Sequence, residues 1–221
     1  KEYHRPIAEL MASHCRGVIY DRRSCGQSDM VIGGEGAEAE ICADDLAELI
    51  RQLGIAPAYV CEYAGARVGL LLAIRHPELV KALLLGWPCG GTVAAQRLGQ
   101  GQYGAFIEAA EQGGMAAVVE RPFIRSEGAE VNPASRERLL AMDVQEFIRV
   151  MRGWQDYFTN SAELPIAGIP ATEEQVASIR TPTVIVAGDD DVHTLTSARR
   201  LHSLIPDSEY HDPPIPDDVW K

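Results

Sequence analysis

The sequence is short of basic residues. Its 221 residues include 20 lysines and arginines against 32 aspartates and glutamates, a formal net charge of −12. Because phosphate binding requires a basic surface, this balance argues against a nucleic-acid partner. We read the arginine pairs Arg22-Arg23 and Arg199-Arg200 as local features, and the acidic balance as one that favours solubility.

Long apolar runs are also missing. No stretch approaches the roughly 20 apolar residues that a membrane-spanning helix requires. No charged, then apolar, then small-residue segment opens the chain, as it would in a secretory signal. We therefore expect no membrane partner.

Cysteines are few and scattered. The five are odd in number and include no Cys-x-x-Cys pair, so neither a zinc ribbon nor a dithiol redox motif is predicted. We expect a reduced, cytoplasmic setting, with no cofactor and no bound metal.

What the sequence does contain is an alternation of short apolar runs and helical patterns. Strands are predicted at residues 17–21, 58–61, 82–85, 183–187 and 208–211, and helices are predicted between most of them. Strands separated by single helices predict a parallel sheet with right-handed crossovers. Ligands of such sheets bind beyond the carboxyl ends of the strands, so a site is expected in the loops after Tyr20, Cys61, Leu85 and Ala187.

The middle of the chain lacks the strand pattern. Helical signals replace it: an amphipathic run from Phe147 to Phe158, an N-cap at Asn132 and a capping box at Thr172. We predict an inserted helical lid over residues 88–172, between core segments 1–87 and 173–221.

Several motifs in order resemble the α/β-hydrolase superfamily. Residues 20–29 resemble the strand-and-turn motif D-x-R-G-x-G-x-S, with Ser24 in place of one glycine. Residues 75–78 (Arg-His-Pro-Glu) resemble the end of the helix after the nucleophile elbow, and residues 187–191 resemble the loop that carries the catalytic acid. The resemblance implies an α/β fold with a mostly parallel sheet flanked by helices and an inserted lid.

The family pattern extends beyond both ends of this chain. It begins with further strands, which carry part of the oxyanion hole, and it closes with a helix. The resemblance therefore implies that N-terminal strands and a C-terminal helix are missing here. A domain built without them would expose a sheet edge, and a partner or a homo-oligomer would be needed to cover it.

The elbow departs from the family. The motif G-x-S-x-G lies between a strand and a helix, and the aligned residues 61–65 read Cys-Glu-Tyr-Ala-Gly. Tyr63 therefore occupies the serine position. It is a candidate catalytic residue with three open roles: a pocket-filling side chain, a hydrogen-bond donor or proton shuttle, and a nucleophile. Its phenol, with a reference pKa near 10, is a poor nucleophile unless that pKa is lowered. Glu62, at the lip of the expected pocket, is a candidate base.

The resemblance also suggests the remaining members of a triad. The acid maps best to Asp191 by its spacing from Gly188, while Asp189 and Asp190 stay open as alternatives. The family histidine would fall near Asp217 or Asp218, where this chain has none. His193, just after the acid loop, and His211, in the last predicted strand, are the candidate histidines.

Two readings of function remain. The first is an α/β-hydrolase-family enzyme, a hydrolase or a related lyase or isomerase, acting on a small, fairly apolar molecule. The alternative is a non-catalytic relative that binds a ligand or a protein, which the missing serine favours. The residues expected to line the substrate site are Cys61, Ala64, Trp87 and Trp154.

Overall fold

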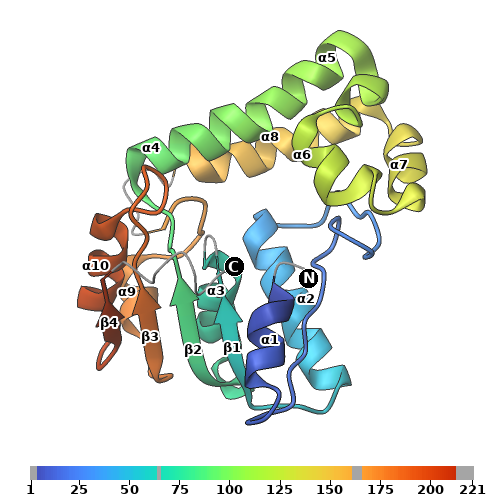
Figure 1. The fold of residues 1–221 in the computed structure, drawn as a ribbon. Coiled ribbons are helices and arrows are strands. Elements are labelled where there is room, and N and C mark those ends of the chain that lie inside the picture. Colours follow the sequence, from blue (N-terminus) through green and yellow to red (C-terminus); the bar gives the residue numbers. More distant parts are fainter. Residues whose placement is uncertain (1–3, 64–65, 161–165, 213–221) are drawn as a thin grey trace. The chain divides into compact units, whose positions relative to one another are not determined.

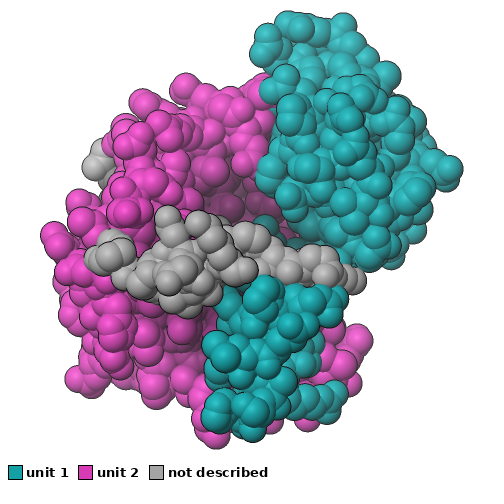
Figure 2. Space-filling model, viewed as in Figure 1, with its two compact units in different colours: residues 1–33, 106–150, 215–221 teal, residues 34–105, 151–214 magenta. Residues whose placement is uncertain are grey.

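The computed structural model describes residues 4–63, 66–160 and 166–212 (Figure 1). The chain forms two compact units, coloured separately in Figure 2. Unit 1 comprises residues 1–33, 106–150 and 215–221, and unit 2 comprises residues 34–105 and 151–214. Each unit is described by itself below.

Unit 2 is built on a parallel sheet. Its four strands are β1 (Ala58–Glu62), β2 (Val80–Gly86), β3 (Thr183–Val186) and β4 (Glu209–His211), in the order β1-β2-β3-β4. Every neighbouring pair runs parallel, with Cys61 opposite Leu84 and Leu85 opposite Ile185. The carboxyl ends of the strands therefore meet at one edge, which confirms the predicted parallel α/β sheet.

The inner strands are apolar because helices cover them. Leu83 and Leu85 of β2 and Ile185 of β3 are almost completely buried. Strands enclosed on both faces read as continuous apolar runs rather than as alternating ones. Leu83 and Leu85 thus lie at the centre of the unit 2 core, and Leu84 between them is half-buried.

Helix α3 (Arg67–Arg75) packs on β1 and β2, and α2 (Glu38–Gln52) packs on α3. Because α3 lies between the sheet and another helix, it is apolar on almost every side, with Val68, Leu70, Leu71 and Leu72 buried. A short turn of 3₁₀-helix, η2 (Pro77–Leu79), then leads into β2. The predicted end of the helix before Pro77 is confirmed.

Helices α9 (Glu173–Ala177) and α10 (Leu195–Leu204) accompany the last two strands. Thr172 caps α9 with the predicted capping box: its hydroxyl accepts the N–H of Gln175 at 3.2 Å, and the Gln175 side chain accepts the N–H of Thr172 at 2.8 Å. Helix α10 connects β3 to β4 and packs against both.

Residues 91–160 are mostly helical, with short turns between the helices. The elements are α4 (Gly91–Gln96), the π-helical η3 (Arg97–Gly104), α5 (Ala105–Val118), α6 (Pro122–Ile124), the π-helical η4 (Arg125–Ala129), α7 (Pro133–Leu140) and α8 (Val144–Asn160). Asn132 caps α7 as predicted, accepting the N–H of Ala134 at 3.1 Å. The two units divide this stretch, so the lid assignment for residues 88–172 stays a prediction.

The predicted strand at residues 17–21 was wrong. Unit 1 begins with α1 (Arg5–Met11), and residues 17–21 then continue as irregular chain. Val18 is 43% exposed, and no strand pairs with this segment among the described residues. A β-branched run forms a strand only where a neighbour completes its hydrogen bonds.

Candidate active site

The elbow position lies at the carboxyl end of β1. Tyr63 follows β1, and α3 begins at Arg67 after Ala66, which has a left-handed backbone (φ +54°). The Tyr63 ring lies over Gly86 at the end of β2: a Cβ on Gly86 would come within 2.5 Å of the ring. Only glycine at position 86 leaves room for the ring.

Trp87 packs against Tyr63 and against His193. The ring centroids of Tyr63 and Trp87 are 4.9 Å apart, and those of Trp87 and His193 are 5.9 Å apart. Trp87 follows β2 with a positive φ of +52°, and its backbone N–H donates to the carbonyl of Val186 at 2.8 Å. A bulky residue in this conformation is uncommon and is held there by its surroundings.

A carboxylate orients His193. His193 Nδ1 lies 2.7 Å from Asp190 Oδ2, and Asp190 Oδ1 accepts the backbone N–H groups of Val192 at 2.7 Å and of His193 at 2.8 Å. The loop closes tightly, since a Cβ on Gly188 would lie 2.6 Å from the His193 Cβ. With Nδ1–H donating to the carboxylate, Nε2 is left as the proton acceptor.

These contacts also set the charge of Asp190. Partial burial raises the pKa of Asp190, but the hydrogen bonds from His193 and Val192 outweigh it and hold the pKa below its usual value. Asp190 is therefore an anion at neutral pH. An ionised carboxylate on Nδ1 fixes the tautomer and the orientation of the His193 ring.

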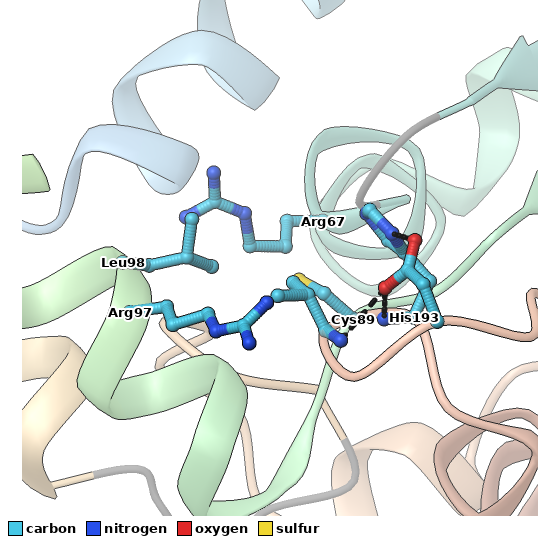
Figure 3. Close-up of a pocket in the computed structure, with 7 residues that line it drawn as sticks. Arg67, Cys89, Arg97, Leu98 and His193 are labelled. Atoms are coloured by element: carbon cyan, nitrogen blue, oxygen red, sulfur yellow. Dashed lines mark hydrogen bonds and ion pairs between the residues drawn. The ribbon is translucent and has the colours of Figure 1, made fainter. Parts of the chain in front are cut away.

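A pocket of about 490 Å³ opens beside this pair, within unit 2 (Figure 3). Its lining comes from the segments after β1, β2 and β3 and from η3. The lining residues are Arg67, Cys89, Arg97, Leu98, Asp190, Val192 and His193. The pocket thus lies where the chain leaves β1, β2 and β3, as expected of a site, and its role as the functional site stays a prediction.

Cys89 forms the buried part of the lining. It is 2% exposed, and burial raises the pKa of its thiol, which the nearby Arg67 only partly offsets. The thiol is therefore protonated at neutral pH. A buried neutral thiol is a poor nucleophile, so Cys89 shapes the pocket wall.

The structure separates the candidate acids. Asp190, rather than Asp191, contacts His193. Asp191 turns outward, and its Oδ2 accepts a hydrogen bond from Arg97 at 2.8 Å. His211, in β4, forms a 2.8 Å pair with Glu209 and is not among the described residues that line the pocket.

The other predicted site residues, Tyr63 and Trp87 among them, lie outside the described lining of the pocket. The Glu62 side chain leaves β1 on the face that α3 covers, because its Cβ lies 3.0 Å from the point where a Cβ on Gly69 of α3 would be. Cys61 is exposed, and Ala64 is outside the described residues. Trp154, in α8, is buried beside Tyr103, with ring centroids 6.1 Å apart.

Sequence reasoning missed the two pocket arginines. Arg67 is the first residue of α3 and follows Tyr63 closely in the sequence, so its position just after the elbow could have marked it as a site residue. Arg97 begins η3, far along the chain from the elbow, and no sequence motif marks it. Figure 3 shows the two side chains extending in opposite directions, with Arg97 reaching toward Cys89.

Two further observations concern the described part of the chain. Residues 4–63, 66–160 and 166–212 contain no group of three or more His, Cys, Asp or Glu side chains arranged to hold a metal ion. No helix in these ranges combines the length and the apolar character needed to cross a membrane.

Comparison with known proteins identifies the family. A model described as "Alpha/beta hydrolase family" matches residues 2–214. The chain belongs to the α/β-hydrolase family. The resemblance drawn from the turn, helix and acid-loop motifs is thereby confirmed.

Several family members are similar in sequence. A protein of Agrobacterium fabrum named "Putative carbamate hydrolase RutD" is 27% identical over 219 residues, covering 94% of this chain and 77% of that protein. The "Uncharacterized hydrolase YraK" of Bacillus subtilis is 37% identical over 79 residues, covering 35% of this chain and 29% of that protein.

Solved structures show the same fold. The α/β-hydrolase enzyme MGS-M2, from a Medee basin deep-sea metagenome library, matches with a TM-score of 0.62 at 20% identity, over 100% of this chain and 82% of its own. The enol-lactonase of Burkholderia xenovorans matches with a TM-score of 0.61 at 19% identity, over 96% of this chain and 77% of its own.

Proposed function

We propose that this α/β-hydrolase-family chain is an enzyme that hydrolyses a small ester, lactone or carbamate, with His193 as general base. The observation that carries the proposal is the 2.7 Å contact between Asp190 Oδ2 and His193 Nδ1 at the wall of the pocket. The names of related proteins, a carbamate hydrolase and an enol-lactonase, supply the substrate classes to test.

The reaction uses water as the nucleophile. Nε2 of His193 takes a proton from a bound water, whose oxygen attacks the carbonyl carbon of the substrate. The bond from that carbon to the leaving oxygen or nitrogen then breaks. The protonated His193 returns its proton to the leaving group, so that one water is consumed and the enzyme is restored.

In this proposal Tyr63 is not the nucleophile: its ring supports Trp87, which contacts His193, and its hydroxyl is a hydrogen-bond donor. Its phenol has a reference pKa near 10 and is a weak nucleophile at neutral pH. Its ring is fixed between Gly86 and Trp87. Tyr63→Phe keeps this packing, so we expect it to reduce kcat/KM by up to about tenfold, the value of one hydrogen bond, without loss of folding.

The test is a hydrolysis assay over neutral esters, lactones and carbamates, comparing wild type with His193→Gln. Removing the base should lower kcat by about 10²-fold or more. The matched control is His202→Gln, because His202 lies on α10, bonds to Ser208 and is outside the described lining of the pocket. The proposal fails if the substitution at His193 costs no more than the one at His202.

A second candidate function is ligand binding without turnover, which Tyr63 at the serine position supports. It predicts that wild type hydrolyses none of the panel and that Tyr63→Ser gains esterase activity where the remaining machinery is intact. Turnover that depends on His193 would rule this function out.

A further inference from the structure

Two arginines line the pocket, although the chain is strongly acidic. They are Arg67 and Arg97, and the lining also includes one carboxylate, Asp190. Asp190 already accepts hydrogen bonds from its own loop, including one from His193, and Asp191, outside the described lining, pairs with Arg97. In a protein with a formal net charge of −12, two guanidinium groups in one pocket distinguish it from the chain as a whole.

Arg67 is the fixed member of the pair. It is half-buried at the start of α3, and its guanidinium lies over the Phe158 ring, 4.9 Å from the centroid. A cation–π contact engages the face of the guanidinium, whereas its N–H donors lie in the plane of the group. The ring therefore holds the cation in place in the pocket wall.

Arg97 is the exchangeable member. Its Nη2 bonds to Asp191 Oδ2 at 2.8 Å, but the two side chains are 58% and 71% exposed. Exposed ion pairs contribute little, because water and salt screen them. Asp191 therefore binds Arg97 weakly, and the carboxylate of a ligand in the pocket can displace it.

We infer that the pocket binds a small molecule with a carboxylate group, held by Arg67 and by Arg97 after Asp191 is displaced. Leu98, Val192 and Cys89 supply the apolar part of the wall. The ligand is accordingly a short apolar body with an anionic end, rather than the fairly apolar molecule expected from the sequence. This inference deepens the proposed function by naming the class of substrate.

The test uses malonate, with its neutral diamide, malonamide, as the matched probe, by isothermal titration calorimetry at fixed ionic strength. Neither probe contains an ester, lactone or carbamate bond, so binding is measured in the wild-type protein independently of turnover. We expect malonate to bind at least tenfold more tightly than malonamide, since Arg–carboxylate pairs are charge-assisted and often bidentate.

Three variants locate the binding. Arg97→Gln should weaken malonate binding about tenfold, while Asp191→Asn should tighten it about two- to fivefold by releasing Arg97. Arg200→Gln is the control, because Arg200 is an exposed arginine paired with Glu173 outside the described lining of the pocket. It should leave the affinity unchanged.

Equal binding of the two probes, or an equal loss in Arg97→Gln and Arg200→Gln, would overturn the inference. Arg67→Lys, which keeps the charge but loses the planar donors, adds a test at the fixed arginine, with an expected loss of about fivefold. If neutral substrates are hydrolysed through His193 while malonate does not bind, only the substrate class is wrong. If malonate binds without any turnover, only the proposed reaction is wrong.

Discussion

Replacing Asp190 with asparagine should invert the tautomer of His193. In the native structure Asp190 Oδ1 accepts two backbone N–H groups and Oδ2 accepts His193 Nδ1–H. In Asp190→Asn, the amide oxygen keeps the two backbone donors, and the NH₂ group then faces Nδ1. Nδ1 becomes the acceptor, the proton moves to Nε2, and the general base is lost.

The magnitude follows from the contacts that change. Hydrogen bonds to a charged group contribute about 1.5–3 kcal/mol when they are buried. The Asp190 side chain is 49% exposed, so we discount this to about 1 kcal/mol of unfolding free energy. The effect on turnover should be larger, about 10²- to 10⁴-fold in kcat, because the base itself is removed.

The assay is a long-range ¹H–¹⁵N NMR spectrum of the histidine rings. The chain has six histidines, and the signals of His193 are identified by their loss in His193→Gln. Asp191→Asn is the control, since Asp191 pairs with Arg97 and should leave the ring unchanged. An Nε2–H tautomer in the wild type, or no change in Asp190→Asn, would refute the proposed role of Asp190.

Three smaller predictions test how the fold positions the site. Gly86→Ala should cost about 1–3 kcal/mol in unfolding free energy and change the near-UV circular dichroism, because its Cβ would lie 2.5 Å from the Tyr63 ring; an unchanged spectrum would contradict the packing. Thr172→Ala should cost about 1 kcal/mol in chemical denaturation by removing the α9 cap. Acid should destabilise the fold partly through Asp44: partial burial raises the pKa of Asp44, but the hydrogen bonds from Arg75 and His76 lower it further. The stability that Asp44 contributes is present above its unfolded-state pKa of about 3.9 and is lost as the pH falls through its lowered pKa in the folded state. In Asp44→Asn this part of the acid dependence of stability should therefore disappear.

The sheet could be predicted because its signals are local. The strands β1 to β4 are short runs bounded by turn residues, and the leucine run in β2 predicts a buried strand, as the structure shows for Leu83 and Leu85. Residues 17–21 show the limit of this reasoning. Their β-branched pattern resembles that of the true strands, but a strand also requires a pairing neighbour, and composition does not supply one.

For the candidate site, the sequence could predict the loops that form it but not which residues of those loops come together. Asp189, Asp190 and Asp191 are consecutive, and the sequence alone does not distinguish them. What selects Asp190 is the backbone of the next turn, which directs the N–H groups of Val192 and His193 at its carboxylate. Arg67 and Arg97 are 30 residues apart in the sequence. Only the tertiary structure brings both to one pocket, so no local sequence pattern predicts them together.

The most direct test of the central claim is single-turnover hydrolysis by purified wild type and His193→Gln, followed by intact mass of the protein quenched during the reaction. The proposal predicts that wild type forms product at least about 10²-fold faster than the variant and that its mass stays unchanged, because water attacks the substrate directly. An acyl adduct on Tyr63, or equal rates for the two proteins, would contradict it.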